Sequence, residues 1–535
     1  MPRFRQLPSF VAWCSTISNL SMAKSIQSRF AVSLIANLLR SGIAFATGLL
    51  VARWMGPQEY GRLVFLLSSF IALRQLLDMG SSTAFFTLLS QQQRTKRFVA
   101  IYGGWVAIQL LISILLVYFL LPDEIIERVW VGESRSILLL ALVASFMQGT
   151  VWSLASQMAE ANRETHRVQR LNSLIVILHL VVVVVIWWLG ELAISLIFIA
   201  MVIEWTVASV WAARMYWATP KISKSDGRCV DTPQSVLREV LSYCLPLIPY
   251  AWLGCVSDFA DRWMLQTWGG AKNQAYFGVA QQFAAIALLA TASILKIFWK
   301  EIAEAHFCGN GELVRRLYLK VSRFLYFVGA LMAGGLMPWA NEILSVTVGN
   351  AYSDGALTLM LMFLYPVHQS MGQIGGTVLY ATGHVKAKVV IGMVYMVLGL
   401  VAAYIVLAPP DHEIPGLGAG APGLVWKLVG LQVFSANTVA WYIARVHGWK
   451  FDWAYQPVGL AVCLFLGWGV HESIFLVLSS GTSAFLQMIL AGVCYVALVL
   501  GAVLIMPWVA GTTREELSRY ARHCLQSVVQ RIVHQ

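Results

Sequence analysis

Long apolar segments recur along nearly the whole chain and alternate with short polar segments. A transmembrane helix needs about 20 predominantly apolar residues, and fourteen segments come close to that length. The pattern therefore predicts an all-α polytopic membrane protein with about 14 transmembrane helices. The segments are Phe30–Val51, Leu63–Leu89, Phe98–Leu121, Ile137–Gln157, Leu171–Leu189, Leu192–Trp211, Val240–Trp268, Ala275–Phe298, Phe324–Ile343, Ala356–Tyr380, Val389–Leu407, Leu424–Ile443, Ala454–Val470 and Ala484–Trp508.

Composition excludes a conventional soluble fold. Hydrophobic residues make up 58% of the 535 positions and charged residues 12%, whereas soluble domains carry about 25% charged residues. The net charge of +12 does not indicate a nucleic-acid partner, because the basic residues lie in loops between apolar spans. The eight cysteines form no CxxC pair, which argues against a disulfide framework or a metal site. No GxxxxGK[ST] loop is present, so we expect no ATP hydrolysis and no cofactor.

The distribution of Lys and Arg between alternate loops predicts the orientation in the membrane. Cytoplasmic loops collect these residues, and one set of loops holds most of them here, so both termini and this set are expected to be cytoplasmic in the cell inner (plasma) membrane. The opposite loops hold only Arg53, Arg62, Arg128, Arg135 and Lys272. The basic set comprises Arg94, Lys96, Arg97, Arg163, Arg167, Arg170, Lys221, Lys224, Arg228, Arg315, Arg316, Lys320, Lys386, Lys388, Arg445 and Lys450.

A weak internal repeat predicts two lobes. The turn Gly56–Gly61 after the first span has a counterpart around Gly270 and Tyr276, and the turn Glu160–Glu164 has one at Ala381–Val385. The two offsets are similar, which indicates two six-helix lobes followed by two extra helices. The expected division is an N-terminal cytoplasmic tail (1–29), an N-lobe (30–215), a cytoplasmic linker (216–239), a C-lobe (240–446), helices 13 and 14 (447–510) and a basic amphipathic cytoplasmic tail (511–535).

Several short motifs resemble those of a transporter family. The segment Leu49–Gly61 resembles the first-loop signature of Wzx-type O-antigen and exopolysaccharide flippases, and Asp78–Gly80 resembles the Asp-x-Gly that closes their second helix. Further matches are Leu245-Pro246, Asp261-Arg262, Tyr276, Gly349-x-x-Tyr352 and Ala381-Thr382-Gly383. The family belongs to the multidrug, oligosaccharidyl-lipid and polysaccharide exporter superfamily.

This resemblance implies both a shape and a substrate. The fold would be V-shaped with two lobes, and the substrate would be a polyprenyl-diphosphate-linked oligosaccharide moved from the cytoplasmic to the periplasmic leaflet. Such a chain would serve the assembly of O-antigen, capsule or exopolysaccharide. Its partners would be membrane lipids and polysaccharide assembly proteins such as a polymerase.

Charged residues deep inside the predicted spans are the candidate functional groups. Arg40, Arg74, Asp78 and Asp258 lie ten residues or more from any predicted membrane edge, and Glu204 lies seven residues from one. An ionised group in hydrocarbon costs from about 3 to over 10 kcal/mol, so such groups face a cavity or a partner. Arg40 has no acidic residue within one turn, and we expect it either to line a cavity or to pair with an acid on another helix.

Two pairs of opposite charge are spaced four residues apart. Arg74 and Asp78 share a face of the second predicted helix, and Asp258 and Arg262 share a face of the seventh, with Asp261 beside them. Such neighbours can neutralise one another. Alternatively, Arg74 and Arg262 join Arg40 as cavity cations that bind substrate phosphate, while the carboxylates act in gating or ion coupling.

The remaining candidates are polar residues in apolar spans. Glu204 and His179 each suit either a coupling proton or a buried hydrogen bond, and for His179 the hydrogen bond is favoured. His368 and Gln369 lie in a polar patch that could contact sugar. Lys427 lies near a helix end, which favours a side chain that extends to the interface.

Three functions compete on this basis. A lipid-linked oligosaccharide flippase fits the predicted cationic cavity and the family resemblance. A multidrug or cation antiporter of the same superfamily has a similar number of spans, but cavity cations favour an anionic substrate. A membrane-embedded polysaccharide polymerase or ligase needs a sizeable external loop with catalytic groups, and none is evident, so we expect a transporter and not an enzyme.

Overall fold

The computed structural model describes residues 20–91, 94, 96–162, 164–190, 192–218, 232–478, 483–512 and 514–515. Side chains at 20–36 and at a few positions between 290 and 297 are also outside this description. Most of the predicted N-terminal tail, linker and basic C-terminal tail therefore lie outside the described residues. Within them, regular structure is helical and no strand occurs.

The N-terminal half contains eight α-helices. They are α2 (Leu20–Asp78), α3 (Ser81–Gln91), α4 (Lys96–Leu115), α5 (Asp123–Trp130), α6 (Arg135–Phe146), α7 (Trp152–Ala161), α8 (Thr165–Trp188) and α9 (Ile194–Ala218). Two π-helical turns, η1 (Leu116–Leu120) and η2 (Met147–Val151), extend α4 and join α6 to α7.

The C-terminal half contains eleven. They are α10 (Pro233–Cys244), α11 (Ile248–Met264), α12 (Gly270–Phe307), α13 (Gly311–Leu336), α14 (Ala340–Thr347), α15 (Ala356–Met362), α16 (Tyr365–Ala381), α17 (Val385–Leu407), α18 (Gly420–His447), α19 (Tyr455–Val477) and α20 (Ala484–Ile505). A π-helical turn, η3 (Leu265–Gly269), links α11 to α12, and short 3₁₀ turns occur at Met337–Trp339, Asn350–Gly355 and Pro507–Ala510.

Each of the fourteen predicted spans coincides with a helix or with consecutive helices. In the described parts of the chain, nine helical segments are long and apolar enough to cross a membrane, and a tenth is the bent pair that starts with α10. This number is lower than fourteen for two reasons. Helix α2 is counted once although it contains the first predicted span and most of the second, and α16 and α18 are not counted; both pack against several other helices. The predicted all-α polytopic fold is confirmed.

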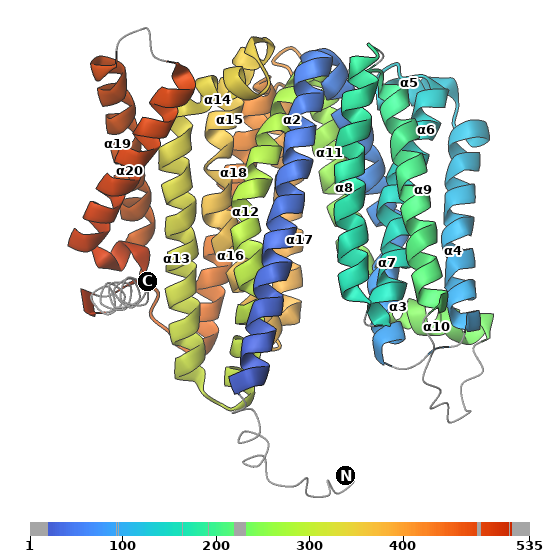
Figure 1. Ribbon diagram of the computed structural model, residues 1–535, viewed down its shortest axis with the longest axis horizontal. Coiled ribbons are helices and arrows are strands. Elements are labelled where there is room, and N and C mark those ends of the chain that lie inside the picture. The colour runs from blue at the N-terminus through green and yellow to red at the C-terminus, as the bar shows by residue number, and fades with distance from the viewer. Residues whose placement is uncertain are drawn as a thin grey trace, which may run out of the picture.

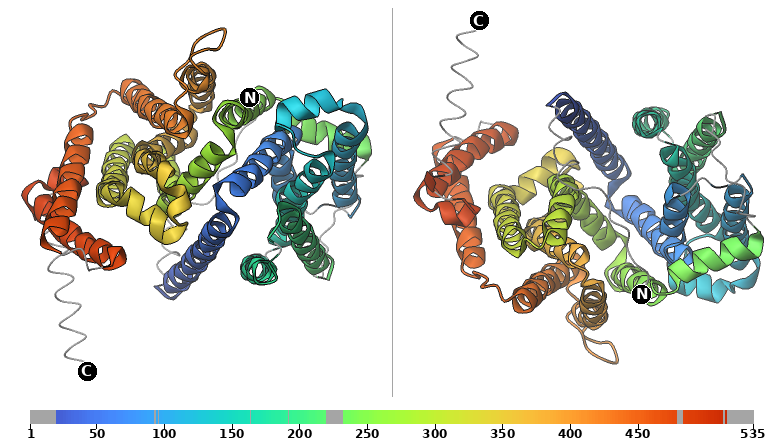
Figure 2. Two further views of the ribbon diagram at one scale, coloured as in Figure 1. Left: turned by 90° about the horizontal axis from the view of Figure 1, so that it is seen from above. Right: turned by 90° about the horizontal axis from the view of Figure 1, so that it is seen from below.

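The helices form two groups with α2 between them (Figures 1 and 2). In the N-lobe, the second half of α2 packs with α6, and α9 packs against α6, α7 and α8. In the C-lobe, α16 packs against α13 and α18, and α11 packs against α17. The pair α19–α20 lies on the outer side of the C-lobe and is attached through α13. This is the expected arrangement of two lobes plus two C-terminal helices.

Helix α2 bends sharply and so supplies two spans. Gly56 has φ 73° and ψ 169°, a conformation outside the helical region, and Pro57 follows it. Glycine reaches positive φ without steric cost, and proline is well tolerated at the start of a helix. We call Leu20–Met55 the first arm and Pro57–Asp78 the second arm. Seen from below, the first arm stands apart from the N-lobe helices (Figure 2).

The lobes are joined at the end where α2 bends, which is the upper end in Figure 1. The Tyr352 hydroxyl donates to the carbonyl of Ala52 at 2.8 Å, and Arg53 donates to the carbonyl of Val346 at 2.9 Å. Gly61 packs so closely on α12 that a Cβ there would lie 1.8 Å from the carbonyl oxygen of Ala271. This end of the molecule is therefore closed.

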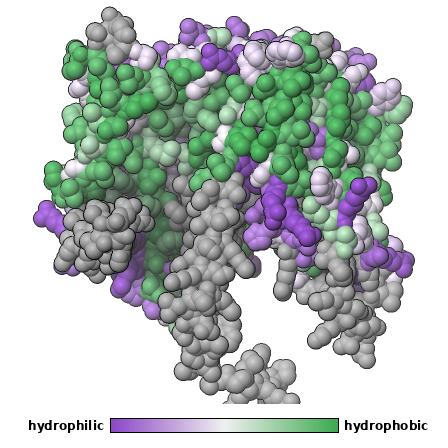
Figure 3. Space-filling model, viewed as in Figure 1, coloured by the Kyte–Doolittle hydropathy of each residue, from purple (hydrophilic) through white to green (hydrophobic). Residues whose placement is uncertain are grey.

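The described surface carries a broad hydrophobic band, as a bilayer requires. Figure 3 shows hydrophilic residues gathered at the upper and lower ends, and also in the lower half between the two lobes. The hydrophobic band is therefore interrupted by polar side chains in the region where the two lobes separate.

The expected seventh span is broken. It was predicted to run continuously over Val240–Trp268, but α10 and α11 meet at an angle of 66° around Leu245–Leu247. Helix α10 packs against α3 and α4, and Glu239 on it pairs with the buried guanidinium of Arg94 at 2.6 Å. Pro246 explains the break, because proline lacks the backbone N–H that would continue the helix and its ring clashes with the carbonyl four residues earlier. The start of the predicted C-lobe is thus packed on the N-lobe.

The close approach at Gly61 yields a prediction. In Gly61→Ala the new methyl group meets backbone, which cannot rotate away, so the two helices must separate by at least about 1.6 Å to reach ordinary contact. We expect spin labels at the exposed positions Glu127 and Ser353 to show a longer mean separation than in the unsubstituted protein.

Gly42→Ala is the matched control, because a Cβ at Gly42 on the same helix meets nothing within 4 Å. Its label separation should equal that of the parent. An unchanged separation in Gly61→Ala would show that this contact does not set the distance between the lobes.

Candidate functional site

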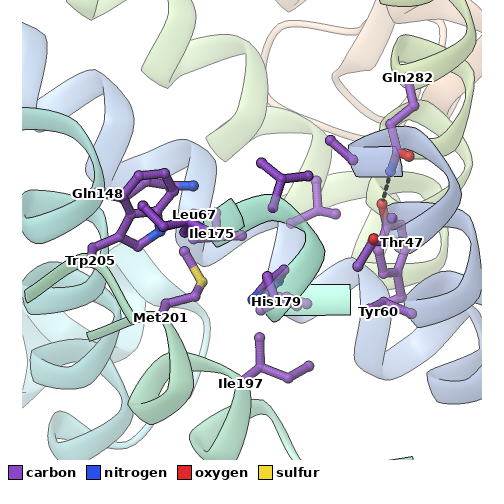
Figure 4. Close-up of a pocket in the computed structure, with 16 residues that line it drawn as sticks. Thr47, Tyr60, Leu67, Gln148, Ile175, His179, Ile197, Met201, Trp205 and Gln282 are labelled. Atoms are coloured by element: carbon purple, nitrogen blue, oxygen red, sulfur yellow. Dashed lines mark hydrogen bonds between the residues drawn. The ribbon is translucent and has the colours of Figure 1, made fainter. Parts of the chain in front are cut away.

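Two of the cavities that border α2 lie against Gln281 or Gln282 of α12. The first, which we call the N-lobe cavity, has a volume of about 300 Å³ and lies between both arms of α2, the helices α8 and α9, and one residue of α12 (Figure 4). The second, the interlobe cavity, has a volume of about 270 Å³ and lies between the second arm of α2 and the helices α11, α12 and α18.

The N-lobe cavity combines apolar walls with a few polar groups. Its polar side chains are Thr47, Tyr60, Gln148, His179 and Gln282, and its largest ring is the indole of Trp205. Gln282 comes from α12 of the C-lobe and its amide donates a hydrogen bond to the hydroxyl of Tyr60 (Figure 4). The cavity is therefore closed on one side by a hydrogen bond between the lobes.

His179 and Glu204 form a pair at the wall of this cavity. His179 Nδ1 lies 2.8 Å from Glu204 Oε2, and the two residues come from the neighbouring helices α8 and α9. Glu204 is only 5% exposed, and its other oxygen, Oε1, has no hydrogen-bond partner among the described residues. The favoured interpretation of His179 as a hydrogen-bonded residue fits this contact, but its partner is the acidic residue that the sequence singled out separately.

The interlobe cavity contains the acidic cluster of α11. Asp258, Asp261 and Arg262 line it, together with Phe277 and Gln281 of α12. Asp258 is exposed and makes no hydrogen bond or ion pair with any described residue. It presents a free carboxylate to this cavity.

Asp261 is neutralised by a lysine from another helix. Lys427 Nζ lies 2.7 and 2.6 Å from the two carboxylate oxygens of Asp261, and Lys427 is 7% exposed. The prediction that Lys427 extends to the interface is therefore wrong. Its ammonium group is buried in the C-lobe, where a carboxylate compensates for the lost water.

Arg262 does not pair with Asp258, which corrects the second predicted ion pair. Its guanidinium donates to the amide oxygen of Gln274 at 3.2 Å and to that of Gln281, and it lies 4.4 Å from the ring centroid of Phe277. Amide oxygens and an aromatic face hold this cation without cancelling its charge.

The first predicted pair, Arg74 with Asp78, is also absent. Asp78 instead caps α3: it accepts from the backbone N–H of Ser82 at 2.9 Å and of Gly80 at 3.2 Å, and from the hydroxyls of Ser81 and Ser82. Asp is a preferred capping residue because its oxygens satisfy backbone donors at a helix start. The role found for Asp78 is structural.

Arg74 lies over the π-helical turn η2. A Cβ on Gly149 would come within 2.2–2.4 Å of three guanidinium atoms of Arg74, so the planar group rests directly on the glycine. Its Nε is buried and has no hydrogen-bond partner among the described residues. Only a glycine at position 149 leaves room for this arrangement.

Arg40 is half-buried on the first arm of α2. It shares a helix face with Ala44, Thr47 and Gly48, which line the N-lobe cavity. It makes no hydrogen bond or ion pair with the described residues. Arg40 precedes Gly56 by sixteen residues and Arg74 follows it by eighteen, so the two lie at similar depths, about 24 and 27 Å along their arms from the bend.

The three predicted cavity cations thus do not share one cavity. Arg262 lines the interlobe cavity. Arg40 and Arg74 line neither cavity and lie further from the bend of α2 than the α2 residues that do. His368 is 8% exposed, and its ring meets that of Tyr326 at a centroid distance of 5.1 Å inside the C-lobe. Neither His368 nor Gln369 lines either cavity.

Comparison with known proteins bears on the fold. No family model and no curated protein matches the sequence. A structure described as lipid II flippase MurJ in an inward closed conformation matches with a TM-score of 0.68 and 13% identity, covering 90% of this chain and 100% of that one. The chain has the fold of MOP superfamily transporters.

Two further structures belong to that superfamily by their descriptions. An inward-facing multidrug resistance MATE family transporter matches with a TM-score of 0.61 and 15% identity over 76% of this chain and 95% of that one. A MOP superfamily transporter from Pyrococcus furiosus matches with a TM-score of 0.52 and 14% identity over 78% and 95%. At sequence identities this low, the similarity is one of fold alone. The structures that share the fold include both a flippase and a drug transporter.

The buried pair of Asp261 and Lys427 yields a prediction for stability. Removing one partner leaves an uncompensated buried charge, which costs about 3–5 kcal/mol. We expect Lys427→Met to lower the thermal unfolding temperature of the detergent-purified protein strongly.

The double variant Asp261→Asn/Lys427→Met should be less destabilised than Lys427→Met alone, because no unpaired charge remains. Additive losses in the double variant would contradict a direct interaction between these two residues.

Proposed function

We propose that this chain is a flippase that moves polyprenyl-diphosphate-linked oligosaccharide across the cell inner membrane for surface polysaccharide assembly. The motifs that resemble Wzx-type flippases support this substrate class, and the fold shared with a lipid II flippase is compatible with it. The physical requirement is a polar path for the diphosphate and the sugars, while the polyprenyl tail stays in lipid.

The observation that carries the proposal is the state of Arg40 and Arg74. No described carboxylate pairs with either guanidinium, although both lie on spans of a membrane-embedded helix. An uncompensated cation at that depth needs water or an anionic ligand. A diphosphate supplies the anion, and the planar guanidinium binds phosphate oxygens through paired, charge-assisted hydrogen bonds.

The closed end of the molecule gives the proposal a direction. The distribution of basic loops supports a cytoplasmic location for the end opposite the α2 bend, and the lobes part toward that end (Figures 1 and 3). Arg40 and Arg74 would then be reached from the cytoplasmic leaflet. Alternating access closes this side and opens the contacts made by Gly61, Arg53 and Tyr352 on the other.

A cation antiporter is the second candidate. The free carboxylate of Asp258 in the interlobe cavity favours it, because an acidic group beside the Phe277 ring suits a cationic aromatic drug. Proteoliposomes that expel a cationic dye, and do not move a lipid-linked oligosaccharide, would favour this function. A polymerase or ligase has no supporting group of catalytic residues in the described loops.

Arg40 gives the direct test. In proteoliposomes, Arg40→Ala should slow translocation of a fluorescent polyprenyl-diphosphate-linked oligosaccharide at low concentration by about thirtyfold or more, because a lost charge-assisted hydrogen bond costs about 2 kcal/mol. Arg40→Lys should retain part of the rate. Protein levels in the membrane should be normal in both.

Leu39→Ala is the control, since this neighbour is 63% exposed. It should translocate the probe at the parental rate. Full activity of Arg40→Ala would remove Arg40 from the substrate path.

The position of Arg74 is tested through Gly149. In Gly149→Ala the methyl group displaces the guanidinium, which lies at the end of a flexible side chain, so the fold should survive while translocation falls. If Arg74 is the group affected, Arg74→Ala/Gly149→Ala should be no slower than Arg74→Ala alone. Gly103→Ala, where a Cβ meets nothing within 4 Å, serves as the control. Fully additive losses would mean that Gly149 acts on something else.

A further inference from the structure

The pair of His179 and Glu204 differs from the charged groups inside the membrane whose partners fully satisfy them. Lys427 is paired with a carboxylate, Arg262 with amides, and Asp78 with the start of α3. The His179–Glu204 pair is joined by one hydrogen bond of 2.8 Å, and Glu204 Oε1 is buried without a partner in the described structure. This leaves a carboxylate that is only partly compensated.

The charge of the pair depends on one proton. When a single proton is shared between His179 Nδ1 and Glu204 Oε2, the pair carries one negative charge. A second proton adds to the lone pair of His179 Nε2, no bond breaks, and the pair becomes a neutral unit of imidazolium and carboxylate. Neutrality removes the penalty of an isolated charge in an apolar surrounding.

The geometry gives the imidazole access to water. His179 lines the N-lobe cavity, and Glu204 lies behind it with 5% exposure. A cavity of about 300 Å³ holds several waters, each of which takes about 30 Å³ in the liquid. A proton can therefore reach the ring through water in the cavity and leave by the same route.

Few other charged groups face the pair. Tyr60 on the second arm of α2 shares the cavity, Arg40 lies on the first arm, and Arg74 rests on η2 beside the cavity residue Gln148. The charged residues of α8 and α9 lie near the ends of those helices: His166, Arg167 and Arg170 on α8 and Arg214 on α9. Gln282 is the residue of α12 that lines this cavity.

We propose that the His179–Glu204 pair is a proton-binding site through which transport is coupled to the proton gradient. The inference deepens the proposed function and rests on the chain being a transporter, whichever substrate it carries. The neutral, protonated pair is compatible with a closed, dry cavity. The negatively charged pair requires a hydrated one, so proton loading favours closure of the cavity and proton release favours its opening.

The site can be tested without any substrate. Proteoliposomes adsorbed on a solid-supported membrane give a transient current when protons bind at a site within the membrane field. We expect a jump from about pH 8 to about pH 6 to produce such a current with the full-length protein. Glu204→Gln and His179→Gln should each reduce it by roughly fivefold or more.

Ser209→Ala is the matched control, because Ser209 lies on the same helix, is buried, and has a hydroxyl without a hydrogen-bond partner in the described residues. It should keep the parental current. An undiminished current in Glu204→Gln, or an equal loss in Ser209→Ala, would overturn the proposal, since the signal would then come from elsewhere or from the packing of α9.

A second measurement separates this inference from the proposed function. With the fluorescent lipid-linked oligosaccharide as probe, Glu204→Gln should still exchange the probe between leaflets when no gradient is present, but should lose acceleration by an inward proton gradient. Absence of probe movement in the parent protein would defeat the proposed substrate and leave the pH-jump result to decide the proton site. Gradient acceleration that persists in Glu204→Gln would contradict the coupling.

Discussion

A charged side chain at the depth of the hydrocarbon core must meet an opposite charge, a hydrogen-bonding group or water, because lipid offers none of these. This constraint sorts the deep charges of the chain into two sets. Asp261 and Lys427 neutralise each other, and the carboxylate of Asp78 accepts hydrogen bonds from the first residues of α3. The second set consists of side chains with a charge or a hydrogen-bonding atom that no described residue satisfies: Arg40, Arg74, Asp258 and Glu204. Charges of the first set hold helices together, and those of the second set are available for ligands.

The bend of α2 determines where the second set lies. Because Gly56 turns the chain back, the two arms descend from one point, and each carries an arginine at a similar depth. The same bend brings Gly61 against the backbone of Ala271 and closes that end. The contact that joins the lobes and the two arginines are therefore parts of one helix, and Arg40 and Arg74 lie about 24 and 27 Å along their arms from the bend.

Hydropathy was enough to predict the helices, because a span is a property of a short segment. It could not predict partners. Spacing of four residues shows only that two side chains share a helix face, so the pairs of Arg74 with Asp78 and Asp258 with Arg262 were wrong. Lys427 is separated by 166 residues from its partner Asp261, and no local pattern identifies such a contact.

Some features did leave a signal in the sequence. Ser81 and Ser82 directly after Asp78-Met79-Gly80 are typical of a helix start, and they could have identified Asp78 as a cap. Likewise Pro246 could have marked the break between α10 and α11. By contrast, nothing local shows that His179 meets Glu204, since the two helices could have packed in another register.

The two cavities are linked through one turn of α12. Gln281 receives a hydrogen bond from Arg262 in the interlobe cavity, and the next residue, Gln282, donates one to Tyr60 in the N-lobe cavity. Consecutive residues of a helix point in directions about 100° apart, so a single rigid element contacts both sites. A movement of α12 along α2 alters the Gln282–Tyr60 hydrogen bond, whereas the Arg262–Gln281 bond changes only when α12 also moves relative to α11. The position of α12 relative to both α2 and α11 is therefore fixed, in part, by two consecutive glutamines, one at each cavity.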